Sequence, residues 1–119
     1  MSRLLIPMLL AASLLATAEA RAHAMLDHAS PAVGSTVSAP RAVTLWFTQK
    51  LEAAFSTIEV RDGSGARVDA GKAQVDKGNP TVLRTSLKPI KAGTYQVHWR
   101  VLSVDTHTTE GNFSFSVGH

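Results

Sequence analysis

The fold is decided by residues 94–117, TYQVHWRVLSVDTHTTEGNFSFSV. Two runs in this stretch, Thr94–Val104 and Asn112–Val117, alternate apolar and polar residues. Successive side chains of a β-strand point to opposite faces, so each run gathers its large apolar side chains on one face. These side chains are Tyr95, Val97, Trp99 and Val101 in the first run and Phe113, Phe115 and Val117 in the second. We predict that the two runs are central strands of a β-sheet.

The segments that precede this stretch also favour short strands. They contain runs of β-branched and aromatic residues separated by turn-forming residues, with no sustained helical period. Strands are predicted at residues 42–48, 57–61 and 82–87. The second of these is followed by Asp62-Gly63-Ser64-Gly65, which predicts a tight hairpin turn, and then by a polar connection that ends at residues 78–80. Strands at this spacing predict an all-β sandwich of two sheets.

The N-terminus has the pattern of a secretory signal peptide. Arg3 supplies a positive charge, the apolar run from Leu4 to Ala18 is too short to span a bilayer comfortably, and small residues follow it. The positions that satisfy the small-x-small rule for cleavage are Ala20, Ala22 and Ala24. Only cleavage after Ala22 makes His23 the first residue of the mature protein.

The composition after the signal excludes several classes of protein. Removal of residues 1–22 from a chain of 119 leaves 97 residues at 23–119, which are enough for one domain. There is no cysteine, so disulfides, thiolate metal sites and cysteine nucleophiles are excluded. Lysine and arginine are scattered singly, which speaks against nucleic acid as a partner. No second long apolar segment follows, so we expect no membrane insertion after processing.

A candidate metal site combines the new N-terminus with the segment after the longest strand. If the chain stays extended at Asp105-Thr106-His107, the side chains of Asp105 and His107 project from the same face and can converge on one ion. A chain that begins with His23 adds a ring nitrogen and an α-amine, whose pKa near ~8 allows it to bind a metal. Three nitrogens and one oxygen suit Cu(II) better than Cu(I) or Ca²⁺, while Zn²⁺ stays open.

The other three histidines are expected outside this site. We expect His28 in a surface loop, His98 on the solvent face of its strand, and His119 at a frayed terminus. We therefore predict one metal ion per chain, with His23, Asp105 and His107 as its ligands.

These residues resemble the CopC-type periplasmic copper-binding proteins over essentially the whole mature length. The similarity lies in residues 23–31, 43–47 and 93–117. It is densest in the last segment, at Tyr95, Trp99, Arg100, Val101, Ser103, Asp105, His107, Gly111, Phe115 and Val117. The resemblance implies an immunoglobulin-like Greek-key sandwich of about seven strands. It also implies a Cu(II) site of the mature N-terminal His, an Asp and a second His, here His23, Asp105 and His107, and so favours cleavage after Ala22.

The resemblance implies a role in copper homeostasis or resistance. Such a protein would sequester Cu(II) in the periplasm or, as a copper chaperone, deliver it to an inner-membrane partner of the CopD type. The chain departs from the family pattern in two ways. Met25 is the one methionine after the signal, which argues against the methionine-rich Cu(I) site of some members. Thr106 stands where many relatives have glycine, and it would be strained if that position required a positive φ.

Two other functions are weighed against this one. An N-terminal His with a second His is also the copper brace of the oxidative polysaccharide-cleaving monooxygenases, which are β-sandwiches. The Asp105 carboxylate would fill an equatorial position here and the domain is small, so we expect no enzyme. The last alternative is an interaction sandwich without metal, in which Asp105 and His107 only satisfy hydrogen bonds of their loop.

Overall fold

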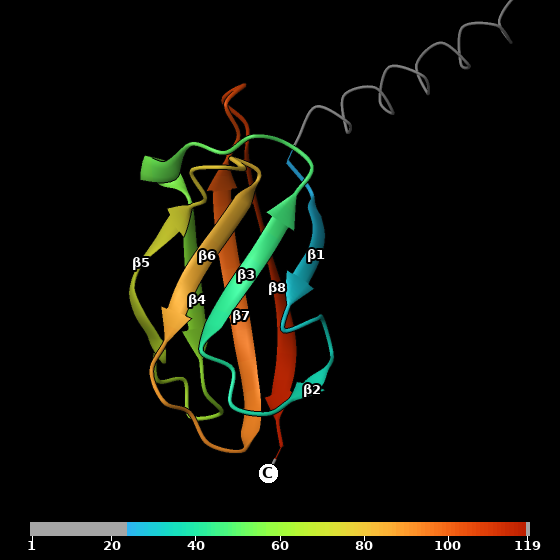
Figure 1. Cartoon of the computed structure of the whole chain (residues 1–119), viewed down its shortest axis with the longest axis vertical. Coiled ribbons are helices and arrows are strands. Elements are labelled where there is room, and N and C mark those ends of the chain that lie inside the picture. The colour runs from blue at the N-terminus through green and yellow to red at the C-terminus, as the bar shows by residue number, and fades with distance from the viewer. Residues whose placement is uncertain (1–23, 119) are drawn as a thin grey trace, which may run out of the picture.

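Eight strands form two four-stranded sheets in residues 24–118, the part of the chain that the computed structural model describes (Figure 1). One sheet has the order β1-β3-β6-β5 and the other has the order β2-β8-β7-β4. The strands are β1 (Leu26–Ser30), β2 (Thr36–Val37), β3 (Ala42–Phe47), β4 (Thr57–Arg61), β5 (Asp69–Val75), β6 (Val82–Leu87), β7 (Gly93–Leu102) and β8 (Thr108–Val117). A short 3-10 helix, η1 (Ala53–Phe55), precedes β4. The predicted immunoglobulin-like Greek-key β-sandwich is confirmed.

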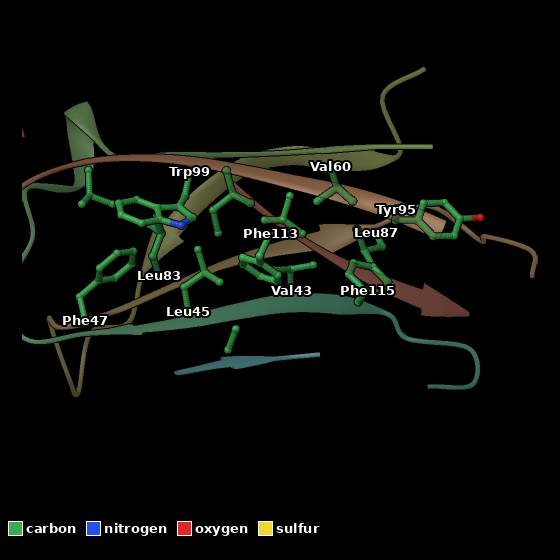
Figure 2. Packing of buried hydrophobic residues seen from close by; sticks show 14 of the residues in the cluster. Val43, Leu45, Phe47, Val60, Leu83, Leu87, Tyr95, Trp99, Phe113 and Phe115 are labelled. Atoms are coloured by element: carbon green, nitrogen blue, oxygen red, sulfur yellow. The ribbon is translucent and has the colours of Figure 1, made fainter. Parts of the chain in front are cut away.

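The two strands predicted to be central are β7 and β8. They pair antiparallel from Gly93 opposite Val117 to Leu102 opposite Thr108 and occupy the middle of their sheet. Their inward side chains meet those of the opposite sheet to form the core, as Figure 2 shows for Trp99, Phe113 and Phe115 against Val43, Leu45 and Phe47. The prediction of central strands is therefore confirmed, although β7 ends two residues earlier than predicted and β8 begins four residues earlier.

Strand β5 lies where a polar connection was predicted, and that prediction is wrong. The strand is at the edge of its sheet, pairs with β6 alone, and is partly exposed. An edge strand that lies half in solvent does not need an apolar face, so its sequence, DAGKAQV, lacks the alternation that marks a buried strand. The short strands β1 and β2, neither of which was predicted, also lie at sheet edges.

The predicted hairpin after β4 is only partly formed. The turn itself is present, because the Gly65 N–H donates to the Asp62 carbonyl at 3.0 Å. However, Arg61 and Arg67 form only an isolated bridge, and β5 then joins the sheet opposite β4. The chain thus crosses from one layer to the other directly after the turn, and β4 and β5 are not a hairpin pair.

The topology brings two distant segments of the chain to one end of the sandwich. In Figure 1, β1 begins and β7 ends at the upper end, whereas the C-terminus lies at the lower end. The connection from β7 to β8 therefore lies at the same end as the first described residues. Within residues 24–118, no helix is long and apolar enough to cross a membrane.

Candidate metal centre

Asp105 and His107 lie in the connection between β7 and β8, and their side chains are brought together. The Nδ1 atom of His107 is 3.4 Å from Oδ1 of Asp105. Both side chains are about half exposed, with 48% of His107 and 45% of Asp105 accessible to solvent. A carboxylate and an imidazole that meet at the surface in this way can both reach a cation from solution.

The backbone that joins the two residues is a turn, so the expectation of an extended chain is wrong. The N–H of Thr106 donates to the carbonyl of Ser103 at 2.9 Å, and the N–H of Ser103 donates to the carbonyl of His107 at 3.0 Å. Thr106 has a φ of 72°, in the left-handed region. The side chains of Asp105 and His107 therefore approach each other across a tight turn rather than along one face of a strand.

Thr106 replaces the glycine that many relatives have at this position, and its positive φ means that its side chain is strained, as the sequence predicted for this case. In the left-handed region a side chain costs about 1–2 kcal/mol, and a β-branched residue lies at the upper end of this range. Glycine avoids this cost but loses about 0.5–1 kcal/mol of backbone entropy on folding. We therefore expect Thr106→Gly to raise the free energy of unfolding by about 1 kcal/mol in urea titrations.

The matched control for this variant is Thr108→Gly, two residues away in the first position of β8. Thr108 is in a strand, where glycine brings only its entropic cost, so this variant is expected to be less stable than the wild type. A destabilised Thr106→Gly protein would show that the turn does not store strain at this residue.

The electrostatics of the turn favour an ionised Asp105. The hydroxyl of Ser103, a residue that is only 1% exposed, donates a hydrogen bond to Oδ1 of Asp105. This hydrogen bond is the main reason that the pKa of Asp105 lies below its usual value, and the nearby His107 lowers the pKa further. The carboxylate is therefore negatively charged at neutral pH, which is the form that binds metal ions.

The first described residues are fixed beside this turn. Ala24 is fully buried, and its carbonyl accepts a hydrogen bond of 2.8 Å from the hydroxyl of Thr109, two residues after His107. Met25 and Thr48 add two hydrogen bonds, from the Met25 N–H to the Thr48 hydroxyl and from the Thr48 N–H to the Met25 carbonyl, both of 3.0 Å. The segment is thus held between the end of β3 and the beginning of β8.

The third predicted ligand, His23, lies outside the described residues, as do the predicted signal peptide, its cleavage sites at Ala20 and Ala22, and His119. His23 directly precedes Ala24 in the sequence. Within residues 24–118, no group of three or more His, Cys, Asp or Glu side chains could hold a metal ion. Of the three predicted ligands, the structure thus describes Asp105 and His107, and it brings these two together.

Two more histidines are described, and the partners found for each lie outside this turn. His28 is in β1 and not in a loop as expected, but it is exposed: its ring stacks on Trp46 at 4.3 Å and its Nδ1 is 2.7 Å from Oδ2 of Asp27. His98 is on the outward face of β7, as predicted. Its Nδ1 is 2.9 Å from the Asn112 side-chain oxygen and its Nε2 is 3.3 Å from Glu110.

Ser103 and Thr109 are the residues of this end to which the sequence alone assigned no role. Ser103 continues the inward series of β7, two residues after the buried Val101, and Thr109 continues the inward series of β8. A hydroxyl on a buried face needs a hydrogen-bond partner, and this was the available signal. The partners themselves could not be read from the pattern, because Ala24 is 85 residues from Thr109.

The described part of the chain is similar to several known proteins. Residues 26–118 match the family described as CopC domain. Copper resistance protein C of Xanthomonas campestris pv. juglandis is 39% identical over 112 residues, which cover 89% of this chain and 88% of that protein. The crystal structure of CopC from Methylosinus trichosporium OB3b superposes with a TM-score of 0.75 at 35% identity, covering 80% of this chain and 93% of that one. Copper transport protein CutJ of Bacillus subtilis is 33% identical over 99 residues, which cover 82% of this chain and 18% of that protein.

Proposed function

The chain belongs to the CopC family of copper resistance and copper transport proteins, and from this membership we propose that it binds one Cu(II) ion in the periplasm through His23, Asp105 and His107. In this proposal residues 1–22 are a signal peptide removed after Ala22, and residues 23–119 are the copper-binding domain. The ligands come from the two segments that meet at one end of the sandwich.

The observation that carries the proposal is the hydrogen bond from Thr109 to the carbonyl of Ala24. It ties the first described residue to β8, two residues from His107. Consecutive Cα atoms are about 3.8 Å apart, so a mature chain that begins at His23 starts within one residue of this anchor. The new α-amine and its imidazole are then beside the turn that carries Asp105 and His107.

The donor set explains the choice of Cu(II). The amine and ring of His23 chelate the ion as a unit, the His107 ring adds a third nitrogen, and the ionised Asp105 adds an oxygen. Nitrogen and oxygen donors in a tetragonal arrangement suit Cu(II), which also binds more tightly than Zn²⁺ to a given site of this kind. Met25 is the one methionine of residues 24–118, so we propose no thioether site for Cu(I).

The ion is cargo in this proposal, and the protein is not an enzyme. In this proposal the Asp105 carboxylate would hold the ion at a coordination position that an oxidase would keep open for oxygen. The similarity to 18% of the length of a protein named copper transport protein CutJ supports a role in delivery. We therefore propose that the protein sequesters Cu(II) and passes it to an inner-membrane partner of the CopD type.

The test is a Cu(II) titration of the protein that begins at His23, with Asp105→Ala and His107→Ala beside it. We expect one ion per chain, and each variant should bind more than about a hundredfold more weakly, because even outer-shell partners of metal ligands contribute tenfold to a hundredfold. His98→Ala is the matched control, since His98 lies between Asn112 and Glu110 and is expected to leave binding unchanged. Absence of tight binding in the wild type, or an equal loss in His98→Ala, contradicts the proposal.

A further inference from the structure

Building on the proposed function, we infer that Ser103 is a positioning residue of the copper site, which holds Oδ1 of Asp105 so that Oδ2 is presented to the Cu(II) ion. Ser103 does not contact the ion itself. It acts through the carboxylate that it orients and through the backbone of His107.

Ser103 belongs both to the core and to the turn that carries Asp105 and His107. It is buried, and it forms a bridge with Leu51 on the neighbouring segment. Its hydroxyl donates to Oδ1 of Asp105, and it accepts a hydrogen bond of 3.3 Å from the N–H of His107. Its backbone N–H donates to the carbonyl of His107 at 3.0 Å. A single buried residue therefore contacts both proposed ligands of the turn.

These contacts distinguish the two oxygens of the Asp105 carboxylate. Within residues 24–118, the side-chain contacts of this carboxylate, the Ser103 hydroxyl and the His107 ring, are both made by Oδ1. Oδ1 is thus the oxygen that faces Ser103 and the His107 ring, and the inference assigns Oδ2 to the ion. We infer a monodentate Asp105, with one oxygen on copper and the other on Ser103.

The hydrogen bond from Ser103 preorganises the Asp105 carboxylate for metal binding. The Asp105 side chain is half exposed and would otherwise lose rotamer freedom when it binds the ion. A hydrogen bond from a rigid, buried donor removes part of that cost before the metal arrives, as outer-shell hydrogen bonds do for metal ligands in general. Ser103 can supply it because it lies one residue beyond the end of β7, in the core.

Ser56 provides a matched control. It is a second buried serine beside β7, and its hydroxyl donates to the Glu52 carbonyl at 2.8 Å and accepts the Leu102 N–H at 3.3 Å. Ser103→Ala and Ser56→Ala each remove one buried hydroxyl that bonds to this part of the chain. Only the first removes a hydrogen bond to a proposed ligand.

The experiment measures Cu(II) affinity and the electron paramagnetic resonance spectrum of the bound ion in the protein that begins at His23. Ser103→Ala is expected to bind Cu(II) about tenfold to a hundredfold more weakly, with an altered spectrum. Ser56→Ala is expected to keep the affinity and the spectrum of the wild type. Ser103→Thr, which retains a hydroxyl, is expected to bind more tightly than Ser103→Ala.

The outcomes separate this inference from the function on which it rests. If the wild type binds one Cu(II) ion and Ser103→Ala matches Ser56→Ala in affinity and spectrum, the role of Ser103 is overturned and the proposed function stands. The role is also overturned if Ser103→Thr binds no better than Ser103→Ala. If the wild type itself does not bind Cu(II), the proposed function fails and the inference fails with it.

Discussion

A protein with one glycine added before His23 is expected to bind Cu(II) at least about a hundredfold more weakly than the protein that begins at His23. The extension leaves every side chain in place. It converts the α-amine, whose pKa near ~8 allows it to lose a proton to a metal, into a peptide amide that is a far poorer donor. The amine and imidazole of His23 then no longer act as one chelate, and the site loses one of its four proposed donors.

This prediction is checked by competition with a chelator of known Cu(II) affinity, with both proteins folded. The matched control carries its glycine after His119, which changes length and composition equally but leaves the amine of His23 free. Equal affinity of the two extended proteins would contradict the N-terminal chelate. An ion bound by side chains alone would give that result.

Trp99→Ala is expected to lower the free energy of unfolding by about 3–5 kcal/mol, the usual range for removal of a large aromatic residue from a core. Trp99 is buried, and its ring meets that of Phe47 edge to face at 5.1 Å. It also packs against Gly111, where an added Cβ would lie only 2.6 Å from Cζ2 of Trp99. The indole lies against the β8 backbone and fills the space between the sheets, so its loss leaves a cavity.

Trp46→Ala is the control, because the chain has two tryptophans and only Trp99 is in the core. Trp46 is half-buried and stacks on His28 at 4.3 Å, a contact of about 1 kcal/mol. The measurement is equilibrium unfolding in urea followed by circular dichroism, which does not depend on the removed fluorophore. Equal losses in the two variants would contradict the assignment of Trp99 to the centre of the core.

The sequence predicted those strands whose alternation of buried and exposed side chains can be read from a short stretch of residues. Strands β7 and β8 were found because a central strand with one buried face must alternate, and their large residues at Tyr95, Trp99 and Phe115 made the alternation plain. Strand β5 was missed because an edge strand in contact with solvent has no such requirement. The pairing of β5 with β6, on the sheet opposite β4, depends on tertiary contacts that no short window contains.

The candidate site was predicted only in part. The approach of Asp105 to His107 was predicted, but from an extended backbone at Thr106 that the structure does not have. The spacing of Asp105 and His107 indicated that they would meet, and they do, but across a turn made by the positive φ of Thr106. From the sequence, Ser103 was named only as a position of the family resemblance, and Thr109 was not singled out. Their partners became apparent once the fold placed the first described residues beside β8.

The most direct test of the proposed copper site is anomalous X-ray diffraction at the copper edge from crystals of the Cu(II)-loaded protein that begins at His23. We expect one copper ion, bound by the amine and ring of His23, by Oδ2 of Asp105 and by the ring of His107. A copper ion at His28 beside Trp46 or at His98 beside Glu110, or an ion at the turn without the His23 amine, would contradict the account.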